Sequence, residues 1–160
     1  MIRRYTEADA DQLMALNQAN VPEVGPLDRA KLDMLVRESD FIDVVEIDGV
    51  VEGALVVMSE GADYPSPNYR WFCKRNPRFT YVDRIMLSPA TRGRGYGKQL
   101  YDRTVAHAHE SGSPLVCAEV NTEPPNPRSL RFHEVFGFAE VARERPYGPD
   151  EEVAMMELIA

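Results

Sequence analysis

Cysteine and histidine are scarce in this chain of 160 residues, which has two cysteines and three histidines. Cys73 and Cys117 stand alone, with no CxxC or CxxH spacing, so the sequence favours reduced thiols over a disulfide framework or a zinc site. His107 and His109 are two residues apart, which would point them to opposite sides of a helix and rules out a shared metal there. No cluster has metal-ligand spacing, and we expect no metal site.

Long apolar runs and excess positive charge are also missing. No apolar stretch approaches the ~20 residues of a membrane span, and the N-terminal MIRRYTEADADQL turns polar at once, unlike a signal peptide. The formal net charge of −8 makes the average field repel phosphate backbones. We therefore expect a single soluble, cytoplasmic domain over residues 1–160, with no nucleic-acid or membrane partner.

Helix and strand signals follow one another along the whole chain. The order of elements is predicted to be β-α-α-β-β-β-α-β-α-β-β, and Asp48-Gly49 predicts a tight hairpin because both residues tolerate positive φ. Residues 61–77 hold three prolines and a group of aromatics, which predicts a structured insertion beside the site. The predicted strands are 2–5, 41–47, 50–59, 79–87, 115–121, 138–144 and 152–159, and the predicted helices are 6–20, one around 32–36, 98–111 and 127–136.

The stretch RGRGYGKQLYDR, residues 92–103, lies between a predicted strand and a predicted helix. Backbone N–H groups at a helix start lack intrahelical partners, and the helix dipole adds partial positive charge there. Glycine lets the backbone approach a ligand, and Arg92, Arg94 and Lys98 add positive charge. The stretch therefore predicts a phosphate-binding loop.

Spacing decides between the known phosphate loops. A dinucleotide fingerprint from Gly93 would need glycine where Lys98 stands, and a P-loop would need Ser or Thr where Gln99 stands. Arg-x-x-Gly-x-Gly does fit, at Arg92, Gly95 and Gly97. Here the sequence resembles the GNAT superfamily of N-acetyltransferases, whose pyrophosphate loop reads [QR]-x-x-G-x-[GA] between the fourth strand and the third helix.

The surrounding sequence carries the same resemblance over about half of the chain. NPRSLRFHEVFGF is similar to a family segment, which is matched by Asn126, Ser129, Phe132, Gly137 and Phe138. The resemblance implies a mixed α/β (α+β) fold, with a mostly antiparallel sheet splayed between its fourth and fifth strands. The runs LNQANVPEVGPLD, YPSPNYRWF and VNTEPPNPRS resemble one subgroup of predicted acetyltransferases.

The resemblance implies acetyl-CoA as the co-substrate. Its pyrophosphate would lie on the glycine loop, and its pantetheine arm would pair with the end of the fourth strand. A backbone N–H at about Leu87 would polarise the thioester carbonyl. The residues expected to bind acetyl-CoA are Ile85, Met86, Leu87, Arg92, Gly93, Arg94, Gly95, Tyr96, Gly97, Lys98, Asn126, Ser129, Phe132 and His133.

Transfer to an amine needs a base, because an alkylammonium with a pKa near ~10.4 has no lone pair at neutral pH. Strand alternation puts Glu119 on one face with Cys117 and Asn121, and Asp83 on one face with Tyr81 and Ile85. Asp83 precedes Arg84 and could simply pair with it, whereas Glu119 interrupts an apolar strand. We favour Glu119 as the base, acting through a water, with a structural carboxylate as the alternative.

The family usually places a tyrosine acid after the phenylalanine of its last helix, and here that position is His133. A histidine can protonate the CoA thiolate, or it can be a neutral helix residue bonded to CoA or to a nearby carbonyl. Tyr101 and Tyr96 are alternative acids. Asn126 is expected to contact the cofactor or to cap the last helix.

The amine acceptor, a small molecule or a peptide, should bind between the first two helices and the insertion. Arg70, Arg75, Arg78 and Arg84 lie in the same region, and any that point inward would favour an amine that also carries a carboxylate. The alternative is that the aromatic insertion is a lid packed on the sheet. The expected acceptor-lining residues are Asn20, Glu23, Tyr64, Tyr69, Trp71 and Phe72.

Three functions remain open at this point. The first is an N-acetyltransferase that transfers the acetyl group directly in a ternary complex. Such an enzyme could be a homodimer, although no feature of the sequence fixes an interface. The second is a non-catalytic acyl-CoA sensor or regulatory module, which the absent tyrosine allows. A hydrolase is weaker, because no serine or cysteine lies in a nucleophile-elbow pattern.

Overall fold

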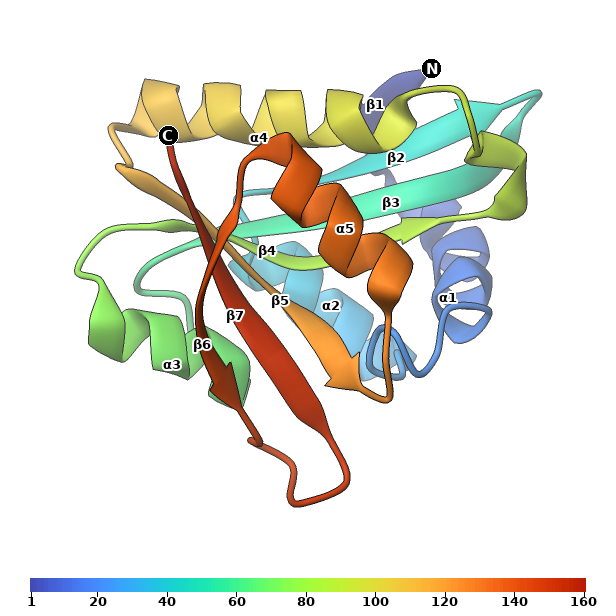
Figure 1. The fold of residues 1–160 in the computed structure, drawn as a ribbon. Helices are drawn as coiled ribbons and strands as arrows, with labels where there is room; N and C mark the ends of the chain where they lie inside the picture. Colours follow the sequence, from blue (N-terminus) through green and yellow to red (C-terminus); the bar gives the residue numbers. More distant parts are fainter.

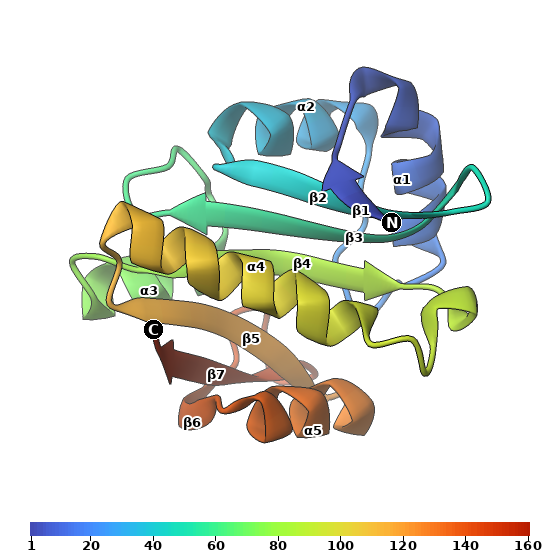
Figure 2. The same cartoon turned by 90° about the horizontal axis from the view of Figure 1, so that it is seen from above.

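The computed structural model describes residues 1–160 as a central sheet with helices on both faces (Figures 1 and 2). Two short 3₁₀ turns, Glu7–Asp9 and Pro89–Thr91, precede the helices α1 and α4. The strands and helices in chain order are β1 Ile2–Arg4, α1 Ala10–Gln18, α2 Arg29–Glu38, β2 Phe41–Ile47, β3 Val50–Ser59, α3 Pro67–Arg75, β4 Thr80–Leu87, α4 Tyr96–Ser111, β5 Leu115–Glu123, α5 Pro127–Phe136, β6 Ala139–Glu144 and β7 Glu152–Ile159.

The sheet has seven strands in the order β1-β2-β3-β4-β5-β7-β6. Every neighbouring pair is antiparallel except β4 and β5, which are parallel. These two strands pair only at Thr80 with Val116 and at Tyr81 with Cys117. Beyond these residues they separate, so the predicted splay is confirmed, and one edge of β4 is left without a strand partner.

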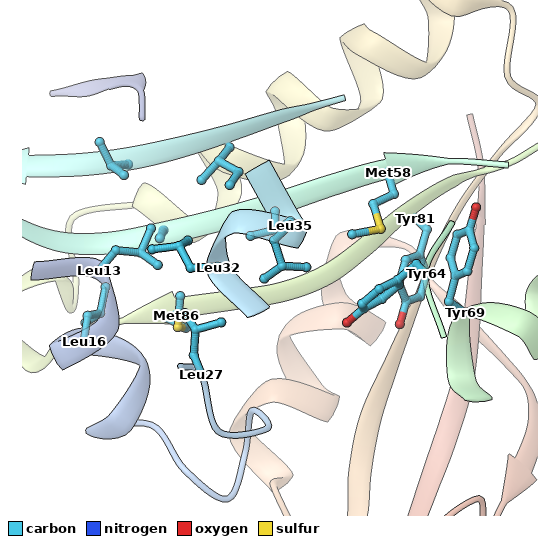
Figure 3. Close-up of a cluster of buried hydrophobic side chains, with 14 of the residues drawn as sticks. Leu13, Leu16, Leu27, Leu32, Leu35, Met58, Tyr64, Tyr69, Tyr81 and Met86 are labelled. Carbon is cyan, nitrogen blue, oxygen red and sulfur yellow. The ribbon is translucent and has the colours of Figure 1, made fainter. Parts of the chain in front are cut away.

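Two hydrophobic clusters hold the helices on the sheet. One lies under α1, α2 and α3 and includes Leu13, Leu32 and Tyr69 (Figure 3). The other lies under α4 and includes Leu100 and Tyr101, with partly buried side chains of α5 packed against it. The two layers leave the splay between β4 and β5 as the one interruption of the sheet.

The hairpin between β2 and β3 follows the sequence prediction. Ile47 pairs with Val50, so the loop is the dipeptide Asp48-Gly49, whose φ angles are +51° and +79°. Both angles are positive, as a two-residue turn of the predicted type requires.

The segment 61–77 contains a helix, α3, that the predicted order of elements lacks. Ser66 caps it by accepting a hydrogen bond from the Tyr69 N–H at 3.3 Å, and Pro67 occupies its first position. Proline is favoured there because that N–H has no helical partner. The insertion is structured, as predicted, and its Ser66-Pro67 pair marks the helix start that the predicted order missed.

A β-bulge changes the faces of β4. Val56 pairs with Arg84 and the next residue of β3, Val57, pairs with Val82, so Asp83 has no partner in β3. A bulge shifts the alternation of side chains by one residue. Tyr81 consequently packs in the cluster under α1 to α3, whereas Ile85 packs against the opposite one, and the predicted common face of Tyr81, Asp83 and Ile85 is wrong.

No helix in the structure combines the length and the apolar character that crossing a membrane would require.

Candidate functional site

A cavity of about 1690 Å³ opens where β4 and β5 separate. Its walls come from the α1–α2 loop, the start of α2 and α3, β4, the glycine loop, β5, α5 and the β6–β7 loop. The cavity therefore joins the predicted phosphate loop, the predicted base and the predicted acceptor region in a single space.

The glycine loop forms the start of α4. Gly93 and Gly95 have φ angles of +73° and +74°, and a Cβ on Gly93 would meet no atom within 4 Å. These glycines are needed for their backbone conformation, on a face that is open to a ligand. Gly97 differs, because a Cβ there would lie 3.2 Å from the Phe132 ring, so it allows α4 and α5 to pack closely.

Most of the loop residues line the cavity, as the sequence predicts. Arg92, Gly93, Gly95, Tyr96, Gly97 and Lys98 do so, but Arg94 does not. The first intrahelical bond of α4 is from the Gln99 N–H to the Gly95 carbonyl, at 3.1 Å. The N–H groups of Gly95, Tyr96, Gly97 and Lys98 have no partner in the protein and are therefore free to bind an anion. The Lys98 ammonium already pairs with Asp102 at 2.7 Å, so the backbone and Arg92 carry most of the attraction.

The end of β4 presents its free edge to the same cavity. Ile85 and Leu87 line it, while the side chain of Met86 is buried in the core on the other side. Only the backbone of Met86 can therefore contact a ligand. An unpaired strand edge offers N–H and C=O groups to an extended chain, which suits an added strand.

Glu119 lies on β5 and lines the cavity. The Tyr81 hydroxyl lies 2.8 Å from both carboxyl oxygens, and the Asn68 amide nitrogen donates to Oε1 at 3.3 Å. Burial, followed by the charge of Asp83, raises the pKa of Glu119 to about 8. A carboxyl group with this pKa exchanges protons near neutral pH, as a general base must.

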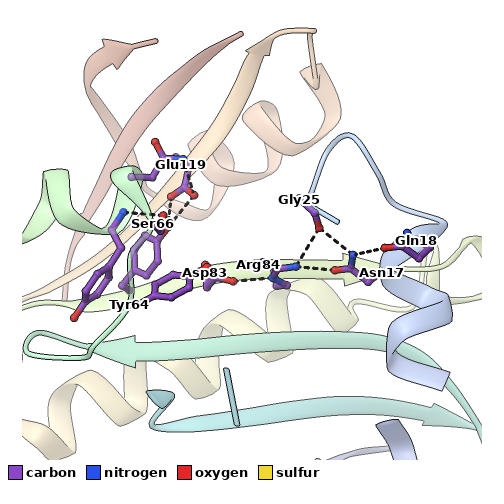
Figure 4. Close-up of polar contacts among 11 residues, drawn as sticks. Asn17, Gln18, Gly25, Tyr64, Ser66, Asp83, Arg84 and Glu119 are labelled. Atoms are coloured by element: carbon purple, nitrogen blue, oxygen red, sulfur yellow. Dashed lines mark hydrogen bonds and ion pairs between the residues drawn. The ribbon is translucent and has the colours of Figure 1, made fainter. Parts of the chain in front are cut away.

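Both carboxyl oxygens of Asp83 accept hydrogen bonds from neighbouring side chains. Its Oδ2 accepts from the Arg84 Nε at 2.7 Å and its Oδ1 accepts from the Tyr64 hydroxyl at 2.5 Å (Figure 4). The side chains of Asp83 and Arg84 are each 4% exposed, so they form a buried ion pair. Asp83 thus keeps its structural role, as the sequence allowed, and acts on Glu119 through its charge.

Arg84 also holds the acceptor wall in place. Its Nη1 donates to the Asn17 Oδ1 at 2.8 Å and to the Gly25 carbonyl at 3.2 Å (Figure 4). Asn17 in turn donates to the same carbonyl at 3.0 Å. The loop between α1 and α2 is therefore attached to β4 beside the carboxylates by a buried polar network.

A family model described as the acetyltransferase (GNAT) family matches residues 10–138. The chain belongs to this family. It is therefore an acyltransferase. None of the curated proteins matches the sequence.

Solved structures with the same fold include enzymes that modify proteins. The ribosomal-protein-alanine N-acetyltransferase from Brucella melitensis is 22% identical with a TM-score of 0.72, and the match covers 100% of this chain and 99% of that one. Ard1 from Thermoplasma volcanium is 20% identical with a TM-score of 0.80, covering 99% and 96%. Naa20 from Chaetomium thermophilum, in complex with a bisubstrate analogue, is 18% identical with a TM-score of 0.78, covering 99% and 86%. At these identities the likeness shows the fold alone.

His133, at the position of the usual GNAT tyrosine, is buried and fully engaged. Its Nδ1 lies 2.7 Å from the Ser129 carbonyl, which can only accept, so Nδ1 carries the proton. Its Nε2 then accepts from the Tyr101 hydroxyl at 2.5 Å. Burial lowers the pKa of His133, so the ring is neutral and has no proton to give at Nε2. This geometry matches the predicted neutral helix residue and argues against a direct acid.

The other predicted residues at α5 cap the helix or line the cavity. Asn126 caps the helix, because its Oδ1 accepts from the Ser129 N–H at 3.4 Å. Asn126, Ser129, Phe132 and His133 all line the cavity.

Only some of the residues predicted to line the acceptor part of the cavity do so. Asn20, Glu23 and Tyr64 line the cavity, but Tyr69, Trp71 and Phe72 do not. Tyr69 is buried in the core (Figure 3). Phe72 is buried there too, and Trp71 packs against the same cluster. These three aromatics therefore fix α3 on the sheet. This arrangement matches the alternative prediction, in which the aromatic insertion is a lid packed on the sheet.

Sequence reasoning missed several residues of this wall. Asn68 is 7% exposed, and its Oδ1 is buried without a hydrogen-bond partner. Lys31 and Tyr147 also line the cavity. The Ser66-Pro67 pair is the one signal that could have located Asn68, because it marks a helix start and so places Asn68 in the first turn of α3. Nothing in the sequence marks Lys31 or Tyr147.

Proposed function

We propose that this GNAT enzyme transfers the acetyl group of acetyl-CoA to a primary amine of a small molecule or peptide, by direct transfer in a ternary complex. The observation that carries the proposal is Glu119, a partly buried carboxyl group with a pKa of about 8. It lines the same cavity as the glycine loop. A base and an anion-binding loop on opposite sides of one splay are what such a transfer needs.

The residues that line the cavity fit acetyl-CoA. The pyrophosphate would be held by the free N–H groups at the start of α4 and by Arg92, and the pantetheine arm by the backbone of Ile85 to Leu87. Bound acetyl-CoA supplies an acetyl group activated as a thioester. The backbone N–H of Leu87 is proposed to stabilise charge on the acetyl oxygen.

Glu119 is proposed to remove the proton that an ammonium acceptor carries, either directly or through a water. It must be ionised to do so, and its pKa of about 8 leaves about a tenth of it ionised at pH 7. Asn68 and Tyr81 donate hydrogen bonds to the ionised form and hold its orientation. The nitrogen lone pair then attacks the thioester carbonyl carbon, the nitrogen loses its second proton to solvent, the C–S bond breaks and CoA leaves as the thiolate.

The thiolate needs no dedicated acid in this account. A thiol has an ordinary pKa near ~8.5, so the thiolate is a stable leaving group at neutral pH. Burial raises the pKa of Tyr101, and its hydroxyl donates a hydrogen bond to His133. Neither side chain is therefore a good proton donor. We propose that solvent supplies this proton, and that His133 and Tyr101 shape the wall.

The test is incubation of the pure protein with isotopically labelled acetyl-CoA and an extract of metabolites and peptides, followed by mass spectrometry. The Gly95→Glu variant, which places a carboxylate in the phosphate loop, is the control. A labelled amine that the variant does not produce supports transfer and identifies the acceptor class. Tight binding of acetyl-CoA with no labelled product would favour the alternative, a non-catalytic acyl-CoA sensor.

A further inference from the structure

The positive charge at the acceptor end of the cavity does not come from the arginines that the sequence suggests. Arg70 is exposed and, like Arg75 and Arg78, lies outside the cavity wall. Arg75 pairs with Glu157 at 2.9 Å, on the surface. Arg84 does line the cavity, but Asp83 neutralises it. None of the four offers a free charge to an acceptor.

Lys31 is the residue that offers a positive charge to the acceptor end of the cavity. It lies in the first turn of α2 and lines the cavity with its neighbours Ala30 and Met34. Its Nζ would be 3.9 Å from a Cβ built on Gly25, so the ammonium rests against the α1–α2 loop. The residue is half-buried, and its pKa is lowered by burial and by the charge of Arg84.

No carboxylate of the chain neutralises this ammonium. Asp28 is occupied as the cap of α2, where it accepts from the Lys31 backbone N–H at 2.8 Å. Asp83 is held by Arg84 and Tyr64. Lys31 itself takes part in no ion pair or side-chain hydrogen bond, and neighbouring charges act on it only at a distance.

The other acids of the cavity wall leave this local excess in place. Glu23 and Glu151 line the cavity but are exposed, so water and salt screen their charge. Glu119 is largely protonated at neutral pH. A half-buried ammonium without a contacting partner has lost hydration that Asp28 and Asp83 offset only from a distance, whereas an anionic ligand group would restore the balance.

We propose that Lys31 forms an anion subsite in the acceptor half of the cavity, and that the natural acceptor is an amine that also carries a carboxylate. The acceptor amine would lie towards Glu119 and its carboxylate towards the first turn of α2. This inference rests on the proposed transfer reaction, because it names the acceptor class of the same site.

The test measures product binding, which does not depend on turnover. N-acetylated amino acids and the matching N-acetylated amino-acid amides are titrated by calorimetry into the wild-type protein and into Lys31→Met. Lys74→Met is the matched control, since Lys74 is exposed on α3 and outside the cavity wall. The wild type and the control are expected to bind the carboxylates at least about fivefold more tightly than the amides, which corresponds to about 1 kcal/mol.

In Lys31→Met this preference is expected to disappear, with binding of the amides unchanged. Equal binding of the two series by the wild type, a preference for the amides, binding of neither series, or a preference that survives Lys31→Met would each overturn the subsite. Turnover with free amino acids and their amides is measured in parallel. Acetylation of the amides at least as fast as of the amino acids would reject the subsite while leaving the transfer reaction intact, and no acetylation of any amine would reject the reaction itself.

Discussion

The pH dependence of Glu119 provides the most detailed prediction. The carboxyl group has a pKa of about 8 because it is partly removed from water and because Asp83 keeps a negative charge nearby. As only the ionised form can act as a base, kcat/KM should rise about tenfold per pH unit below pH 8 and level off above it. In Glu119→Gln this limb should be lost, and kcat should fall about 100- to 10,000-fold, the range of general-base contributions.

The same pKa predicts an effect on stability of known sign. Glu119 binds its proton more tightly in the folded state than in the unfolded chain, so the free energy of unfolding falls as pH rises from about 4.5 towards 8. The difference between these values corresponds to at most about 5 kcal/mol. Glu119→Gln should therefore be more stable than the wild type at pH 8 and about equally stable at pH 4, as denaturant unfolding at the two pH values would show.

Two outcomes would refute this reasoning. One is a kcat/KM that does not change between pH 6 and pH 8, which would mean that no group with this pKa controls the reaction. The other is Glu119→Gln retaining wild-type turnover at saturating acceptor. Calorimetry with CoA is the control, since the variant should bind it with unchanged affinity.

Three further substitutions test separate parts of the structure. Gly95→Glu should abolish CoA binding in calorimetry, whereas Gly61→Glu, at a similar positive φ beyond the end of β3 and outside the cavity wall, should leave it intact; equal losses would mean that only backbone strain is measured. His133→Phe should lower the free energy of unfolding by about 1–3 kcal/mol, because the buried Tyr101 hydroxyl loses its acceptor, while kcat per folded molecule stays within about tenfold; a loss as large as that of the base variant would make His133 part of the chemistry. Arg84→Met should destabilise the fold by about 3–5 kcal/mol in denaturant unfolding, because it leaves a buried carboxylate unpaired, and an unchanged midpoint would contradict the buried ion pair.

Local chemistry in the sequence was sufficient to predict the loop and the hairpin. Gly93 and Gly95 adopt positive φ at a helix start, and Asp48-Gly49 does so in a two-residue turn, because few other residues tolerate that conformation. Glu119 was also identifiable, since a carboxylate in an apolar strand is costly without a role.

The acceptor wall was less predictable because it depends on tertiary packing. Aromatic residues suit both a ligand pocket and a core, and in α3 the core takes Tyr69 and Phe72. The bulge at Asp83 arises from pairing between β3 and β4, and no residue of β4 signals it. Lys31 faces the cavity because of where the α1–α2 loop places α2, which a helical pattern cannot specify.

The most direct test of the account is acetyl transfer by the wild type and by Glu119→Gln at pH 8, with labelled acetyl-CoA and the amine found in the extract. The account predicts a labelled product from the wild type, and a rate at least about 100-fold lower from the variant, which still binds CoA. Equal rates from the two proteins would contradict the central claim that Glu119 is the base in the splay between β4 and β5.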